Sequence, residues 1–353
     1  MNKLVLRAGK TAYQKIKEKG LSPEDIYGVV AAAGGPKWFT TYGLVRYLLA
    51  DFLLSADQEL HFLGASVGSW QMATALAKEP GEALDRLRHA YASSQYASDS
   101  PSRAEISEVC HQIIKASIDG DLDHILSHKT RSLTIITARG KGWLAADSDI
   151  KKGMGFAFGF LSNAIRRQHL NKVSERVVLH HGNELIYNED QDIIATTKVK
   201  LDRSNLIPAL RASGTIPYMM QPLKDLPGAP SGTYWDGGFT DYHISLPYKR
   251  GIVLHPHFLP YVLQGWMDKK LPYQRAAPAA LMDHVLLITP SNSYIETLPR
   301  KQISDMKDFK FYGLDQDTRT RYWLEISNRS LELGEELRDL CRTGKIAEVI
   351  QPY

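Results

Sequence analysis

The sequence has few cysteines and no long hydrophobic run. Its 353 residues include only Cys110 and Cys341, which are far apart and form no C-x-x-C pair or disulfide framework. This pattern excludes a small disulfide-rich secreted domain and fits a reducing compartment. No segment reaches the roughly 18 uninterrupted apolar residues of a transmembrane helix, and the N-terminal residues lack the apolar stretch of a secretory signal. We therefore expect a cytoplasmic protein for which any contact with a membrane would be peripheral.

Neither sign of charge is in large excess. The chain has 43 Lys and Arg against 39 Asp and Glu, and these charges are spread along it. Because there is no basic run, we expect no binding to nucleic acid. The histidines of His180-His181 and His255-Pro256-His257 lack a third ligand at a recognisable spacing. We therefore predict no metal site, and no motif in the chain indicates a cofactor.

Apolar runs alternate with helical patterns. Residues 26–33 and 60–65 indicate buried strands, and residues 37–54 between them keep a helical period. Further apolar runs indicate strands at 133–138 and 176–180, both of the parallel type, and at 251–254 and 285–288. This alternation predicts an α/β fold, a mostly parallel central sheet with helices on both faces. Since there is no repeat or convincing linker, we expect a single domain.

Gly64-Ala65-Ser66-Val67-Gly68 is a G-x-S-x-G pattern. Its flanking glycines allow the cramped turn from strand to helix that exposes a serine hydroxyl at the edge of a sheet. The pattern alone is only moderately specific. Here an apolar strand precedes it and a helical pattern follows it, which is the context that such a turn requires. Ser66 is therefore a candidate nucleophile.

Ala33-Gly34-Gly35-Pro36-Lys37 follows the preceding strand. Free backbone N–H groups at the start of a helix stabilise negative charge, so Gly34 and Gly35 are candidates for an oxyanion hole. The alternative is a phosphate-binding loop, but the pattern matches neither common form and Pro36 removes one amide donor. Lys37 either positions an anionic substrate group or caps the loop, and the sequence leaves both open.

Asp236-Gly237-Gly238 sets an acid before two glycines that permit a close approach to another element. Alone, it would be interpreted as a hairpin turn. Asp241 is a rival acid, but it lacks the two glycines.

In this order, the three motifs resemble those of the patatin-like phospholipase family, over about residues 26–245. The segment Leu210-Arg211-Ala212-Ser213-Gly214-Thr215-Ile216-Pro217 also resembles a short stretch of that family upstream of its aspartate. Ala33 and Trp38 depart from the family, since they stand where its loop usually has glycines. The resemblance implies a three-layer patatin-like domain over 1–353, in which about 246–353 form a helical and strand extension.

The resemblance further implies a serine acyl hydrolase that cleaves lipid acyl esters, of phospholipid or lysophospholipid, through a Ser66–Asp236 dyad. Gly34 and Gly35 would line its oxyanion hole. One alternative is a Ser-Asp-His triad, because several histidines follow Asp236: His243, His255, His257 and His284. Another is a catalytically silent lipid- or protein-binding module of the same fold. From about Met306 onward, the sequence carries no chemistry that we can identify.

Residues 151–161, Lys-Lys-Gly-Met-Gly-Phe-Ala-Phe-Gly-Phe-Leu, form an apolar segment with basic flanks. Such a segment is typical of an interfacial helix that contacts lipid, or of a core helix or acyl-pocket wall with snorkelling lysines. Phe156 and Phe158 are accordingly candidates for substrate binding.

Overall fold

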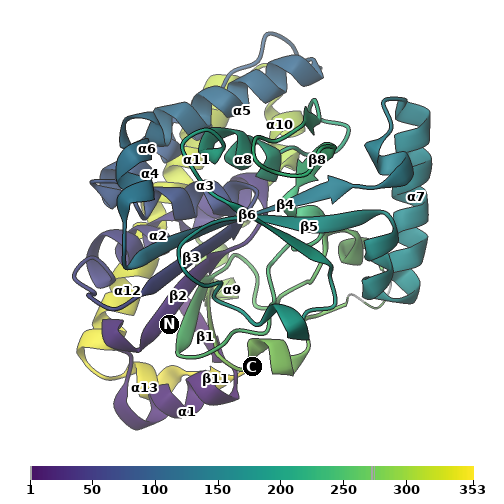
Figure 1. Cartoon of the computed structure of the whole chain (residues 1–353). Helices are drawn as coiled ribbons and strands as arrows, with labels where there is room; N and C mark the ends of the chain where they lie inside the picture. Colours follow the sequence, from purple (N-terminus) through teal and green to yellow (C-terminus); the bar gives the residue numbers. More distant parts are fainter. Residues whose placement is uncertain (1, 272, 274) are drawn as a thin grey trace.

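The computed structural model describes residues 2–271, 273 and 275–353. Within these residues, eleven strands form one mixed sheet, in the order β11-β1-β10-β9-β2-β3-β4-β5-β6 (Figure 1), with β8 added beside β4 and β7 beside β8. The strands are β1 (Leu4–Ala8), β2 (Ile26–Ala31), β3 (Leu60–Ala65), β4 (Arg131–Gly140), β5 (Ser174–His181), β6 (Thr196–Lys200), β7 (Leu223–Lys224), β8 (Thr233–Asp236), β9 (Ile252–Pro256), β10 (Val285–Pro290) and β11 (Gln351–Pro352).

The five strands at the centre of the sheet, β10, β9, β2, β3 and β4, run parallel to one another. The pairs β1–β10, β4–β5, β4–β8 and β7–β8 are antiparallel. The predicted α/β fold with a mostly parallel sheet is confirmed. The pairing of β5 with β4 is a correction, because the sequence indicated a parallel-type strand at 176–180, whereas β5 is parallel only to β6. A strand buried on both faces has the same apolar pattern in either direction, so the pattern does not encode this choice.

The helices surround the sheet (Figure 1). They are α1 (Lys10–Lys19), α2 (Tyr42–Tyr47), α3 (Val67–Thr74), α4 (Pro80–Ala92), α5 (Arg103–Ile118), α6 (Leu122–Ser127), α7 (Asp149–Ile165), α8 (Leu206–Ser213), α9 (Asn292–Ile295), α10 (Lys307–Tyr312), α11 (Gln316–Arg329), α12 (Leu331–Arg342) and α13 (Ile346–Val349). The helix expected at 37–54 is α2 with a 3₁₀ turn before it and a π-helical turn after it. None of the described helices is long and apolar enough to cross a membrane.

The sheet is buried on both faces. Val29 and Phe62 belong to the core under the helices, whereas their chain neighbours Val30 and Leu63 belong to a second core on the opposite face. This two-sided burial explains why β2 and β3 are continuous apolar runs. It also fixes the carboxyl ends of these strands, which carry the loops of the candidate site.

Candidate active site

Ser66 lies in a strained turn between β3 and α3. Its backbone has φ 55° and ψ −136°, a conformation that non-glycine residues rarely adopt. The turn brings α3 against the end of β2, where a Cβ atom on Gly68 would lie 2.1 Å from the carbonyl oxygen of Ala31. Only glycine fits at this position, and this explains the second glycine of the G-x-S-x-G pattern.

Asp236 reaches Ser66 because β8 continues the line of β3. Ala65, the last residue of β3, pairs with Ile136 of β4, and the next residue of β4, Thr137, pairs with Asp236. The chain can turn away directly after Asp236 because Gly237 has no side chain. A Cβ atom at Gly237 would lie 2.2 Å from the carbonyl oxygen of Ile136. The two motifs, which are 170 positions apart in the sequence, therefore meet at one point of the sheet.

Burial raises the pKa of Asp236 from 3.8 to about 6. Asp236 also forms hydrogen bonds with the Ser66 side chain and with the Gly238 N–H, whose nitrogen lies 2.7 Å from Oδ1. These bonds lower the pKa, but they offset only part of the rise that burial causes. A carboxylate with a pKa near neutrality is a far better proton acceptor than an exposed aspartate. Asp236 is thus both oriented and chemically suited to act as a base toward Ser66.

The segment that contains Ser213 supports both residues. The Ser213 hydroxyl oxygen accepts a hydrogen bond from the Ser66 N–H at 2.8 Å and donates one to the carbonyl oxygen of Ile136 at 2.7 Å. Two residues later, the carbonyl oxygen of Thr215 accepts the Asp236 N–H at 2.8 Å. These bonds fix the backbone on both sides of the dyad.

The candidate oxyanion loop lies beside the dyad. The Ala33 N–H is occupied, because it donates to the carbonyl oxygen of Tyr242 at 2.8 Å. The N–H groups of Gly34 and Gly35 have no acceptor among the described residues. Gly35 lines the Ser66 cavity, so its N–H is placed to stabilise an anion there, whereas Gly34 lines a neighbouring small pocket. Trp38 is buried against Phe39, with ring centroids 4.8 Å apart, and it anchors the loop in the core where the family usually has a glycine.

A cavity of about 680 Å³ opens over Ser66 and Gly35. Its wall is largely aromatic and apolar, and it includes Trp70, Tyr91, Ile106, Met219 and Phe309. Sequence reasoning missed the contribution of α10 and α11, which close one side of the cavity with residues beyond Met306. No local motif marks these residues, because their role depends only on where the two helices pack.

No protein-family model matches the chain, and no curated protein matches it either. Among solved structures, the chain is similar to VipD from Legionella pneumophila, with 13% sequence identity and a TM-score of 0.30. The match covers 72% of this chain and 53% of VipD, so this chain spans about half the length of that protein. A likeness of this size is too slight to carry over an activity.

The Lys37 side chain contacts Asp305 and Phe258. Its Nζ lies 3.5 Å from a carboxylate oxygen of Asp305 and 5.0 Å from the centre of the Phe258 ring. Because Lys37 is not among the residues that line the Ser66 cavity, these contacts favour its role in holding the loop over contact with substrate.

Phe156 and Phe158 lie on α7, outside the lining of the Ser66 cavity. The Phe156 ring packs against Tyr218, Trp235 and Phe239, and it lines a separate hollow of about 330 Å³. Trp235 precedes Asp236, so Phe156 supports the strand that carries the acid. Phe158 is 44% exposed and faces solvent.

The histidines expected for a triad lie elsewhere. His243, His255 and His257 are buried together, with ring centroids 4.3 and 5.0 Å apart, and burial lowers the pKa of each. His284 contacts the carbonyl oxygen of Gly251 at 2.9 Å. In the part of the chain that the structure describes, no histidine lines the Ser66 cavity. This placement favours the dyad over the triad.

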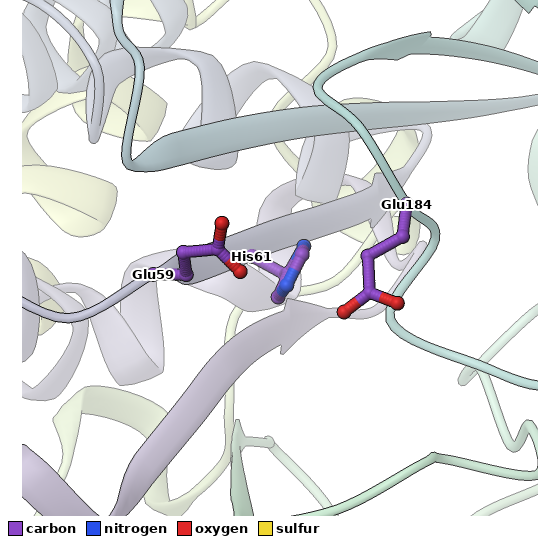
Figure 2. Close-up of side chains that lie close together, drawn as sticks. All are labelled: Glu59, His61 and Glu184. Atoms are coloured by element: carbon purple, nitrogen blue, oxygen red, sulfur yellow. The ribbon is translucent and has the colours of Figure 1, made fainter.

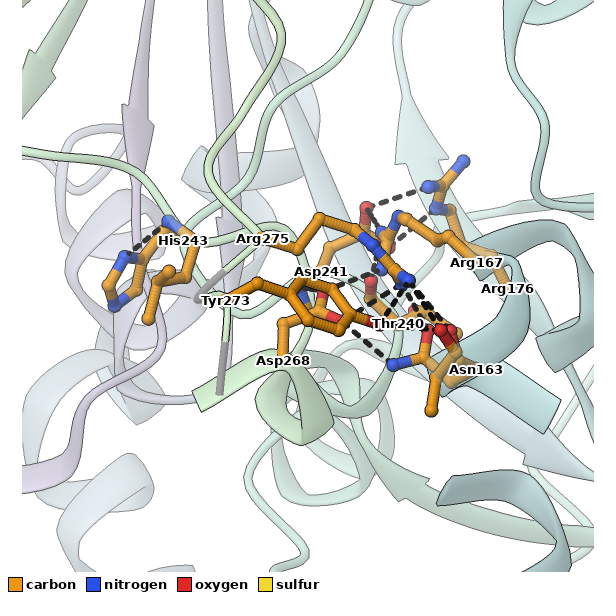
Figure 3. A network of polar contacts seen from close by, with 12 residues as sticks. Asn163, Arg167, Arg176, Thr240, Asp241, His243, Asp268, Tyr273 and Arg275 are labelled. Atoms are coloured by element: carbon orange, nitrogen blue, oxygen red, sulfur yellow. Dashed lines mark hydrogen bonds and ion pairs between the residues drawn. The ribbon is translucent and has the colours of Figure 1, made fainter. Parts of the chain in front are cut away.

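Asp241 is bound to arginines and is not free to act as a base (Figure 3). Its two carboxylate oxygens accept hydrogen bonds from Nε and Nη2 of Arg176 at 2.7 and 2.6 Å, and Arg167 lies 3.7 Å away. Burial acts to raise the pKa of Asp241, but Arg176 and then Arg167 outweigh it, so the pKa lies below its usual value. The same network reaches Asn163 of α7 and Asp268.

Glu59, His61 and Glu184 each offer a ligand atom within 4.8 Å of the others (Figure 2). They lie at the start of β3, at the opposite end from Ser66. Glu184 already pairs with Lys249 at 2.8 Å and Arg250 at 3.1 Å. These cations supply the positive charge that a metal would bring, and the absence of a metal site stays a prediction.

Proposed function

We propose that this chain is a serine acyl hydrolase with a single patatin-like domain, in which Ser66 is the nucleophile and Asp236 is its base. The observation that carries the proposal is the meeting of these two residues beneath a large apolar cavity, where burial raises the pKa of Asp236 to about 6. The register that places β8 directly beyond β3 gives the dyad its geometry.

In the proposed reaction, Asp236 accepts the hydroxyl proton of Ser66 as Ser66 Oγ attacks the ester carbonyl carbon. The N–H groups of Gly34 and Gly35 stabilise the negative charge on the carbonyl oxygen. The tetrahedral intermediate then collapses, and the alcohol leaves with the proton that Asp236 returns. Water, activated by Asp236, attacks the acyl-enzyme and releases the acid. This chemistry needs no cofactor.

The shape of the cavity favours a lipid acyl ester as substrate, of phospholipid or lysophospholipid. Its volume of about 680 Å³ and its aromatic and apolar wall suit an acyl chain. A small polar ester would leave most of this wall in contact with water.

We further propose that α7 contacts a membrane surface. Five large apolar side chains on α7 face solvent, Ile150, Met154, Phe158, Leu161 and Ile165, with exposed fractions of 79%, 48%, 44%, 64% and 74%. Their spacing of three or four residues places them on one face of the helix. Lys151 and Arg166 are exposed at its ends, as in helices that bind anionic lipid surfaces. Tyr218, which packs on Phe156 of α7, is followed by Met219 of the cavity wall, and both side chains are exposed, at 44% and 41%.

Labelling with a fluorophosphonate tests the dyad. Wild-type protein should be labelled at Ser66, the Ser66→Ala variant should not be labelled, and Asp236→Asn should be labelled far more slowly. Ser98 lines the same cavity, but it is exposed and lies outside the turn between β3 and α3, so Ser98→Ala is the matched control and should be labelled like wild type. Wild-type protein without label at Ser66 would instead support the silent binding module.

Sedimentation with anionic phospholipid vesicles tests the membrane face. Phe158→Ser and Leu161→Ser should weaken binding, whereas Leu54→Ser, which removes an apolar side chain that is 52% exposed elsewhere, should not. Equal effects of all three substitutions would contradict a specific role of α7.

A further inference from the structure

Arg319 is a buried cation in the wall of the Ser66 cavity. It lies on α11, is 1% exposed, and forms no ion pair with a carboxylate of the described residues. One end nitrogen, Nη2, donates to the carbonyl oxygen of Ser94, and Nε is buried without an acceptor. The guanidinium lies over the rings of Phe309 and Trp323, 4.7 and 5.0 Å from their centres.

A buried charge of this kind normally has a partner, because its removal from water is costly. Asp308 is the acid that would be expected to pair with Arg319. However, its carboxylate already pairs with Arg300 at 3.0 Å and accepts the indole N–H of Trp323 at 3.0 Å. Asp308 therefore gives the guanidinium of Arg319 no direct counter-charge. The Nε of Arg319 remains a hydrogen-bond donor without an acceptor beside the cavity.

The cavity connects Arg319 with the dyad. Tyr91 lines the same cavity, and its hydroxyl lies close to Gly35. A second cation, Lys310, lines the cavity where it is exposed, and Asp99 is the acidic residue in the lining. Asp99 is itself exposed, so the positive charge of the deep wall belongs to Arg319.

We propose that the cavity binds an acyl ester that carries an anionic group, a carboxylate or a phosphate, and that Arg319 pairs with this group. The proposal rests on the proposed function for the ester, but the binding of an anion by Arg319 does not depend on catalysis. Arginine suits both groups, because its planar fork donates two parallel hydrogen bonds to carboxylate or phosphate oxygens.

Binding to the Ser66→Ala variant separates this proposal from the hydrolase proposal. Trp70 lines the cavity, so quenching of tryptophan fluorescence can report occupancy by decanoate, decyl phosphate or the neutral decanol. We expect at least one of the two anions to bind about tenfold or more tightly than decanol, as a charge-assisted hydrogen bond in a desolvated site would give. The stronger anion identifies the group that the cavity prefers.

Substitution of Arg319 tests its role in this selectivity. Arg319→Met should reduce the ratio of anion to decanol affinity to near unity, and Arg319→Lys should retain part of it. Arg321→Met is the matched control, because Arg321 is an exposed arginine on the same helix, and it should keep the full ratio. Equal binding of anions and decanol by Ser66→Ala would overturn the proposal, as would a ratio that Arg319→Met and Arg321→Met change alike.

Hydrolysis of matched esters by the wild-type protein is the second test of the proposal. With esters of equal chain length, kcat/KM should favour the ester with a terminal carboxylate or phosphate over its neutral methyl ester. If no ester is hydrolysed while Ser66→Ala still selects anions through Arg319, the hydrolase proposal fails and the anion site stands. If neutral and anionic esters are hydrolysed equally, the anion site fails and the hydrolase stands.

Discussion

Replacing Asp236 by asparagine should abolish most activity and yet stabilise the folded protein at neutral to basic pH. The unfolded chain loses the Asp236 proton near pH 3.8, whereas the folded protein keeps it up to about pH 6. Between these values the folded state binds more protons, so the free energy of unfolding falls as pH rises. At about 1.4 kcal/mol for each pH unit, the ionised carboxylate costs the fold about 3 kcal/mol above about pH 6.

Asparagine removes this cost, because its amide oxygen can still accept the Gly238 N–H and it carries no charge. Urea unfolding should therefore show Asp236→Asn to be more stable than wild type by about 3 kcal/mol at about pH 8, with most of the gain lost at about pH 4. Asp241→Asn is the opposite case. It removes the carboxylate that the buried Arg176 and Arg167 share, which leaves them only their second acids, Asp192 and Asp268, and it should cost about 1.5–3 kcal/mol at about pH 8.

The same measurement can refute the reasoning. If Asp236→Asn is less stable than wild type at about pH 8, or if its effect is the same at both pH values, the Asp236 carboxylate is not destabilised by burial. It would then be no stronger a base than an exposed aspartate, and the dyad would lose its chemical basis.

Three further outcomes follow from the same geometry. The kcat/KM for a neutral soluble ester should rise with pH to a plateau above about pH 6, because Asp236 must be ionised; a profile flat down to about pH 4 would exclude it as the base. Ser213→Ala removes the bond to the Ile136 carbonyl and should cost about 1–3 kcal/mol in urea unfolding; an unchanged midpoint would show that the bridge is dispensable. Gly237→Ala should suppress fluorophosphonate labelling, whereas Gly120→Ala, where a Cβ atom meets nothing within 4 Å, should not; equal labelling would count against the close approach.

The sequence was sufficient to predict the α/β class and the strands around Ser66. Residues 26–33 and 60–65 are apolar because β2 and β3 are covered on both faces, and that cause acts locally on every residue of the strand. The strand at Leu4–Ala8, which lies beside the edge strand β11, and the antiparallel pairing of β5 with β4 were not predicted. Both depend on which distant segment pairs with them, and the side-chain pattern of a strand carries no record of its partner.

The candidate site also combines features that the sequence predicts with features that it does not. The glycine motifs could be predicted from the sequence because Gly68 and Gly237 stand where a Cβ atom would collide with another strand. Arg319 gave no such signal. Its place in the cavity follows from the packing of α11, and its lack of an acid depends on Asp308 being held by Arg300. Neither fact is encoded in the residues adjacent to Arg319.

A dyad without histidine requires that the acid be oriented by some other group. In a triad, the aspartate orients the histidine, and the histidine reaches the serine. Here Asp236 is the last residue of β8, its N–H is bound by Thr215, and its carboxylate accepts the Gly238 N–H. The backbone therefore performs the orienting role, and β8 sits where the line of β3 ends, so that no intermediate side chain is needed. The burial that completes this arrangement is also what raises the pKa of Asp236, so the geometry and the basicity of the proposed dyad have one structural cause.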